Sequence, residues 1–122
     1  MTSSPISSTG IFGGSFDPIH LGHLILARDV LEQMGLKRIL FIPAAQAPLR
    51  ANEPKASGAD RLELIRAAIA NETAFDVSDV ELQAGGINYT IDTMQILQDE
   101  YPGEKLSLII GSDQLAQLPQ WK

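Results

Sequence analysis

The chain has 122 residues, of which 44% are hydrophobic and 20% charged, and its formal net charge at pH 7 is −6. These proportions are typical of one globular domain, and the negative charge argues against a general nucleic-acid surface, which needs clustered Lys and Arg. The absence of cysteine excludes disulfides, thiolate metal sites and cysteine nucleophiles. There is no apolar run of the roughly 18–20 residues that span a bilayer, and the N-terminus does not resemble a signal peptide, so we expect a cytoplasmic protein without membrane contact.

The first expected elements are a short buried strand, Ile11–Gly13, and a helix, Gly22–Met34, after a tail (residues 1–8) that we expect to be disordered. The helix is predicted because apolar residues recur at intervals of three and four along one face. These residues are Leu24, Ala27, Leu31 and Met34. Gly35 is the expected terminator of the helix.

Residues 13–23, Gly-Gly-Ser-Phe-Asp-Pro-Ile-His-Leu-Gly-His, join this strand to this helix. A strand followed by a glycine turn and a helix start exposes free backbone N–H groups at the positive end of the helix dipole, which favours anions such as phosphate. His20 and His23 lie three residues apart on one side of the first turn, and each imidazole can donate a hydrogen bond to a phosphate oxygen. Taken singly, the glycines also suit an ordinary turn and a histidine also suits a helix cap.

The rest of the chain continues to alternate between strands and helices, which predicts an α/β fold with a parallel sheet. The expected segments are strand Arg38–Pro43, loop Ala44–Gly58, helix Asp60–Asn71 with Leu62, Ile65 and Ile69 on one side, strand Phe75–Leu82, helix Thr90–Tyr101 through Ile91, Met94 and Leu97, and strand Leu106–Ile110. In such sheets ligands bind beyond the carboxyl ends of the strands. Gly13-Gly14 and Gly111-Ser112-Asp113 both follow expected strands, so we expect the site there.

Three segments carry a resemblance to a known family. His20-Leu21-Gly22-His23 resembles the His-x-Gly-His signature of the adenylyl- and cytidylyltransferase superfamily, and the run 13–23 is most similar to bacterial nicotinate-mononucleotide adenylyltransferases. Asn88–Thr93 resembles that family's Ser-Tyr-Thr-x-Asp-Thr segment. Residues 109–121 resemble its Gly-x-Asp…Trp segment. The resemblance implies a Rossmann-like doubly wound sheet with strand order three-two-one-four, in a single domain over residues 1–122 that is truncated at its C-terminus.

The reaction implied by the resemblance is transfer of AMP from ATP to nicotinate mononucleotide, which gives nicotinate adenine dinucleotide and pyrophosphate. His20 and His23 are the implied catalytic residues. The implied substrate-binding residues are Gly13, Gly14, Ser15, Phe16, Gly22, Arg50, Tyr89, Thr90, Gly111, Asp113 and Trp121. Mg²⁺ is expected to arrive bound to the ATP phosphates, because no acidic cluster in the sequence suggests a dedicated protein site.

Several of these roles have a structural alternative. Asp113 is expected to bind the adenosine ribose hydroxyls, or else to cap a final helix, and Trp121 to stack on the nicotinate ring, or else to lie in the core. Tyr89 and Thr90 open a helix whose N–H groups suit the nicotinate carboxylate. Arg50 is a local counter-charge for phosphate or a solvated loop cation.

The chain also departs from the family pattern. Pro48-Leu49-Arg50 lacks the histidine usual in that loop, an arginine is replaced near Ala84, and the chain ends before the phosphate-binding Ile-Ser-Ser-Thr-x-x-Arg segment. The last expected strand therefore has an uncovered edge, at which we expect self-association unless a natural remainder covers it. The alternatives to the implied function are another His-x-Gly-His adenylyltransferase, such as one acting on pantetheine phosphate, and an inactive nucleotide-binding fragment.

Overall fold

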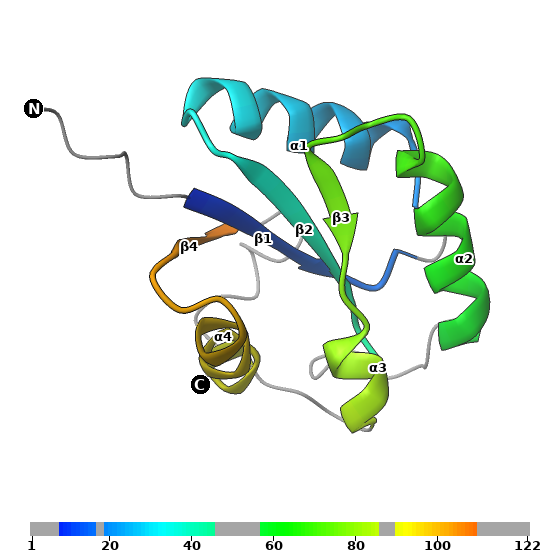
Figure 1. Cartoon of the computed structure of the whole chain (residues 1–122). Coiled ribbons are helices and arrows are strands. Elements are labelled where there is room, and N and C mark those ends of the chain that lie inside the picture. Colours follow the sequence, from blue (N-terminus) through cyan, green and yellow to red (C-terminus); the bar gives the residue numbers. More distant parts are fainter. Residues whose placement is uncertain (1–7, 17–18, 46–56, 86–89, 110–122) are drawn as a thin grey trace, which may run out of the picture.

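A four-stranded parallel sheet with the order β3-β2-β1-β4 forms the centre of the molecule (Figure 1). The computed structural model describes residues 8–16, 19–45, 57–85 and 90–109. Its elements are β1 (Ser8–Gly14), α1 (Leu21–Gln33), β2 (Arg38–Pro43), α2 (Gly58–Ile69), β3 (Phe75–Val77), α3 (Val80–Ala84), α4 (Thr90–Glu100) and β4 (Lys105–Ile109). The α/β class and the strand order are those expected from the sequence.

The central strand β2 is buried on both sides, as its continuous apolar sequence predicts. Ile39 and Phe41 pack with residues of α1 and α2, whereas Leu40 and Ile42 pack with Leu97 of α4. Figure 1 shows the same arrangement, with α1 and α2 on one face of the sheet and α4 on the other. Alternate side chains of one strand therefore hold the two helical layers together.

Glycine ends α1 as predicted. Gly35 has a φ of 62°, and the N–H of Leu36 donates to the carbonyl of Leu31 at 3.0 Å, which is the hydrogen bond of a Schellman cap. The helix ends at Gln33. Met34 was expected on the buried face but is 60% exposed, because it lies in the cap beyond the last helical turn.

The prediction of a strand over Phe75–Leu82 is wrong in its second half. Only Phe75–Val77 pairs with β2, and Val80–Ala84 forms the short helix α3. The N–H of Ser78 still donates to the carbonyl of Phe41, but the Ser78 hydroxyl then accepts from the N–H of Val80 at 3.3 Å. This local side-chain bond turns the backbone away from the sheet.

The buried face of α2 is also displaced from the one expected. Arg61, Ile65 and Ile69 are buried, whereas Leu62 is only partly buried. The Ser57 hydroxyl accepts from the N–H of Asp60 at 3.1 Å and so starts the helix at Gly58, earlier than the sequence suggested. The buried face of α2 thus includes the charged side chain of Arg61, where the apolar pattern predicted Leu62.

The face of α4 is also rotated from the prediction. Thr93 and Leu97 are the buried residues of this helix. Met94 is partly buried against Leu97 and its neighbours, but Ile91 is 66% exposed. Thr93, a polar residue, thus takes a buried position that the apolar pattern did not predict.

A polar cluster at the amino-terminal edge of the sheet connects β1, β2 and the turn before β4. The Arg38 guanidinium donates to Glu104 at 2.6 Å and to the Thr9 hydroxyl at 3.1 Å, and the Thr9 hydroxyl donates to Glu104. Arg38 also lies 4.6 Å from the centre of the Tyr101 ring. This cluster lies at the end of the sheet opposite the glycine turn, so it stabilises the strand pairing without entering the site.

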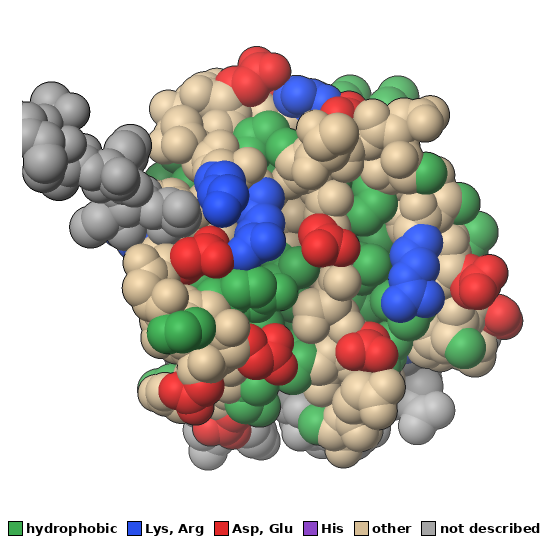
Figure 2. All heavy atoms as spheres, viewed as in Figure 1, with side chains coloured by type: hydrophobic (Ala, Val, Ile, Leu, Met, Phe, Trp, Pro, Cys, Tyr) green, Lys and Arg blue, Asp and Glu red, His purple; other side chains and the backbone are tan. Residues whose placement is uncertain are grey.

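Within the described residues, β4 is an outer strand that pairs with β1 alone. Leu108 on this strand is 38% exposed. The expectation that the chain self-associates at this edge stays a prediction. On the face seen in Figure 2, acidic and basic side chains are interspersed. No helix in the described part of the chain is long and apolar enough to cross a membrane.

Two glycines of β1 provide a matched test of the packing. A Cβ added to Gly10 would lie 2.7 Å from the end of Ile39 and 2.9 Å from those of Leu36 and Ile109, whereas one added to Gly13 would meet, among the described residues, only the Ile42 carbonyl at 3.9 Å. We expect Gly10→Ala to lower the free energy of unfolding by about 1–3 kcal/mol through overpacking. Urea denaturation checks this, with Gly13→Ala as the control that keeps wild-type stability. Equal midpoints for the two variants would contradict the packing argument.

Candidate active site at the carboxyl edge of the sheet

Most of the described candidate residues gather where β1 ends and α1 begins. Gly13 and Gly14 are the last residues of β1, Ser15 and Phe16 follow, and His20 is the N-cap of α1. The neighbours of β1 are β2 on one side and β4 on the other, so this is the point at which the strand order reverses. Ligands of doubly wound sheets bind at such a point.

His20 and His23 form a stacked pair at the start of α1. Their ring centres are 3.8 Å apart and the ring planes differ by 23°. The Nδ1 of His20 accepts from the N–H of Gly22 at 3.1 Å, and the Nδ1 of His23 accepts from the N–H of His20 at 3.0 Å. Each ring thus satisfies a backbone donor that the helix terminus would otherwise leave without a partner.

These two hydrogen bonds determine where each neutral imidazole holds its proton. A nitrogen that accepts a hydrogen bond carries no proton, so the proton of each neutral ring is on Nε2. His20 is exposed and His23 is partly buried. The two rings therefore place imidazole Nε2–H donors, which suit phosphate oxygens, at the positive end of the α1 dipole, while the N–H groups of Gly22, His23 and Leu24 donate to His20. Capping and phosphate contact are thus compatible in the same rings.

The structure gives Gly22 a role in placing the pair. A Cβ added at Gly22 would lie 3.0 Å from Cε1 and 3.1 Å from Nδ1 of His20. A side chain at this position would therefore require the His20 ring to shift by a few tenths of an ångström. The absence of a side chain at Gly22 thus suits the His20 cap, in addition to the close approach of a nucleotide expected from the sequence.

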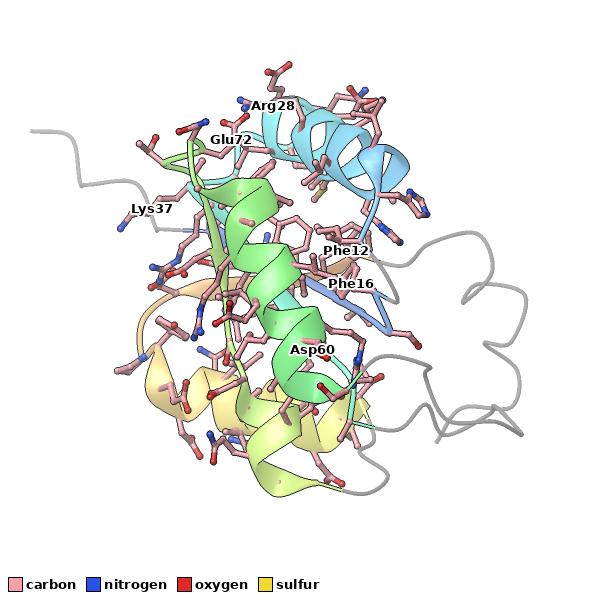
Figure 3. The ribbon with its side chains drawn as sticks, turned by 90° about the vertical axis from the view of Figure 1, so that its right-hand side faces the viewer. Phe12, Phe16, Arg28, Lys37, Asp60 and Glu72 are labelled. Atoms are coloured by element: carbon pink, nitrogen blue, oxygen red, sulfur yellow. The ribbon has the colours of Figure 1, made fainter. Side chains whose placement is uncertain are left out.

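Phe16 packs against the histidine pair through its contact with the His23 ring. Its backbone φ of 47° is in the left-handed region, which bulky residues rarely adopt, and its side chain is only 3% exposed. The Phe16 ring packs edge-on against His23 at 5.0 Å and against Phe12 at 5.3 Å. Figure 3 shows Phe12 and Phe16 together between α1 and α2. The strained backbone thus places an aromatic ring directly beside one of the two imidazoles.

Arg61 is a residue of this edge that sequence reasoning missed. It is 2% exposed, and its Nη1 donates to the carbonyl of Ser15 at 2.8 Å and to that of Ala44 at 2.7 Å. The sequence offered one usable signal, since Arg61 lies four and eight residues before the buried Ile65 and Ile69. That spacing places Arg61 on the buried face of α2. Its residue type predicts the opposite, because arginine side chains are usually exposed.

The segment Asn88–Thr93, which resembles the family's second motif, is described from Thr90 onward. It provides one candidate binding residue and one contact between helices. Thr90 begins α4, as expected. Thr93 is 5% exposed and its hydroxyl donates to Glu81 of α3 at 2.6 Å, which connects the two helices. Among the predicted site residues, Arg50, Tyr89, Gly111, Asp113 and Trp121 lie outside the described residues. No group of three or more His, Cys, Asp or Glu side chains that could hold a metal occurs in the described ranges.

This arrangement is that of a doubly wound α/β protein whose two histidines lie at a helix N-terminus beside the switch point of its sheet. The model of the cytidylyltransferase-like family matches residues 11–122, and the chain belongs to this family.

Relatives and solved structures agree with this assignment. The chain is 50% identical over 113 residues, 93% of its length, to a probable nicotinate-nucleotide adenylyltransferase of Opitutus terrae, and 46% identical over 112 residues, 92% of its length, to one of Aquifex aeolicus. It spans 58% and 66% of the lengths of these two relatives. A Plasmodium falciparum nicotinic acid mononucleotide adenylyltransferase complexed with NaAD superimposes with a TM-score of 0.79 at 19% identity, over 95% of this chain and 57% of that one. The chain thus has the nucleotidyltransferase fold.

The contribution of His20 as the N-cap of α1 can be tested by substitution. We expect His20→Ala to destabilise the protein by about 1 kcal/mol, because the N-cap is lost. His20→Asn should restore most of that stability, since asparagine is a good N-cap, but it removes the imidazole. Thermal or urea unfolding of the two variants measures the difference. Equal destabilisation by both would mean that capping is not what the ring contributes to stability.

Glu81 predicts a pH dependence of stability. Burial raises the pKa of this carboxyl above its ordinary value of 4.5, and the hydrogen bond from Thr93 lowers it in part. The folded state then binds a proton more tightly than the unfolded state, so the free energy of unfolding falls as pH rises from about 4.5 through the raised pKa. Glu81→Gln should remove this fall, and urea unfolding across that range would show it. Glu63→Gln, at an exposed carboxylate of α2, is the control that should keep the wild-type slope.

Proposed function

We propose that the chain transfers AMP from ATP to the phosphate of nicotinate mononucleotide, with release of pyrophosphate, in the biosynthesis of NAD. The observation that carries this proposal is the stacked His20–His23 pair, which lies at the N-terminus of α1 just beyond the end of β1. Identity of 46–50% to relatives named probable nicotinate-nucleotide adenylyltransferase supports the choice of substrate.

The reaction needs no nucleophile from the protein. An oxygen of the mononucleotide phosphate attacks the α-phosphorus of ATP, a new P–O bond forms, and the bond from that phosphorus to the bridging oxygen of pyrophosphate breaks. Negative charge accumulates on the α-phosphate oxygens and on the departing pyrophosphate. The protein therefore has to hold two polyanions in line and stabilise that charge.

The described residues suit this task. His20 and His23 would donate from Nε2 to the reacting phosphates, and the N–H groups of the first turn of α1 would add partial positive charge. At Gly13 the absence of a side chain would allow close approach of a phosphate, and among the described residues an added Cβ would have one neighbour, a carbonyl oxygen at 3.9 Å. At Gly14 an added Cβ would lie in ordinary van der Waals contact with the Phe16 ring, at 3.4 Å.

The remaining assignments are part of the same proposal. Thr90 and Tyr89 would present the N-terminus of α4 to the nicotinate carboxylate, and Arg50 would counter phosphate charge. Asp113 would bind the adenosine ribose and Trp121 would stack on the nicotinate ring, with Gly111 allowing close approach beside them. Mg²⁺ bound to the ATP phosphates would neutralise part of their charge.

A pyrophosphate-release assay with ATP and nicotinate mononucleotide tests the proposal. We expect turnover by this chain, and a loss of about 10²–10³-fold in kcat when a phosphate donor is removed by His23→Ala. Binding of nicotinate adenine dinucleotide, measured by calorimetry, distinguishes the main alternative. Binding without turnover would identify a nucleotide-binding fragment, and neither binding nor turnover would reject the site. Equal turnover of pantetheine phosphate would reject the substrate assignment.

A further inference from the structure

Arg61 lies in a place that ordinary core packing does not explain. It is on the inner face of α2 in line with Ile65 and Ile69, and it is among the largest fully buried side chains of the described residues. Transfer of a guanidinium from water to the interior is costly unless hydrogen bonds compensate. An apolar side chain would complete the face of the helix without that cost, so the charge must contribute something that packing does not.

The contacts of Arg61 indicate what that contribution is. One nitrogen, Nη1, donates to the carbonyls of Ser15 and Ala44, each of which directly follows a strand of the sheet. Ser15 follows β1 and Ala44 follows β2, and the two strand ends are themselves linked by the N–H of Ala44 donating to the carbonyl of Gly14 at 2.9 Å. Arg61 thus fixes the direction in which the chain leaves both strands.

The tether at Ser15 leads directly to the histidine pair. The Ser15 carbonyl belongs to the peptide unit that precedes Phe16, whose φ is 47°. With that carbonyl held inward by Arg61, Phe16 is kept in its strained conformation and its ring stays against His23 at 5.0 Å. His23 in turn accepts the N–H of His20 at 3.0 Å and stacks on its ring.

We propose that Arg61 is a positioning residue for the His20–His23 pair: it holds the Ser15 and Ala44 carbonyls, and through Phe16 it orients the two imidazoles toward the phosphates. Its consequence for catalysis rests on the proposed function. The orientation of the rings does not, and it can be measured without substrates. Arg61 acts on the imidazoles through the Phe16 backbone and ring.

Nitrogen-15 NMR of the imidazoles provides that measurement, because the chain contains only two histidines. In the wild type we expect both neutral rings to show one tautomer, protonated at Nε2. Arg61→Met keeps an unbranched apolar side chain but removes the hydrogen bonds to Ser15 and Ala44. We expect the His23 signals of this variant to lose their single-tautomer character and move toward those of a free imidazole.

Arg66→Met is the matched control, because Arg66 is an exposed arginine of the same helix. It should leave both imidazole spectra unchanged. If Arg61→Met folds with wild-type imidazole signals, the proposal is wrong. If Arg61→Met does not fold, Arg61→Lys replaces it: a folded lysine variant with displaced His23 signals supports the proposal. Failure of both variants to fold would show that Arg61 serves stability alone.

Kinetics separate this proposal from the proposed function. Where the wild-type chain transfers AMP, Arg61→Met should lower kcat by up to about 10²-fold, because a displacement of the catalytic groups by about 1 Å is enough for such a loss, with little change in KM. Arg66→Met should retain wild-type kcat. A wild type without turnover would reject the proposed function, while the imidazole spectra would still decide the role of Arg61.

Discussion

The parallel pairing of β1 with β2 is the constraint on which the rest of the structure depends. Six registered pairs, from Thr9↔Arg38 to Gly14↔Pro43, bring the two strands to an end at the same level. The chain leaves both strands side by side, so one guanidinium from α2 can reach the carbonyl that follows each of them. A shift in this register would separate the Ser15 carbonyl from the Ala44 carbonyl, and one guanidinium would no longer reach both.

The histidine pair shows how a structural need and a chemical one share the same atoms. The start of a helix requires acceptors for its first N–H groups, and the two Nδ1 atoms meet part of that need. Because each Nδ1 faces the backbone, the proton of each neutral ring is on the opposite nitrogen. The capping bonds therefore hold the Nε2–H donors in the orientation that the proposed transfer of AMP uses. The rings are preorganised and need not reorient during the reaction.

Much of the fold followed from local patterns, because those patterns report burial directly. The continuous apolar run of β2, the glycine at the end of α1 and the alternation of strands and helices all led to elements that the structure contains. The errors occur where a short polar contact overrides the pattern. Ser78 redirects the end of the expected third strand into α3, and Thr93 is buried through its hydrogen bond to Glu81.

The sequence alone determined the family and the strand–turn–helix segment that carries the two histidines, because these depend on residues that are neighbours along the chain. Only the tertiary structure decided that the rings stack, that Phe16 adopts a left-handed backbone beside them, and that Arg61 is buried. The physical reason is sequence separation. The bond from Arg61 to Ser15 joins residues 46 positions apart, and whether an arginine on a helix faces water or two carbonyls depends on which strand ends the fold places beneath it.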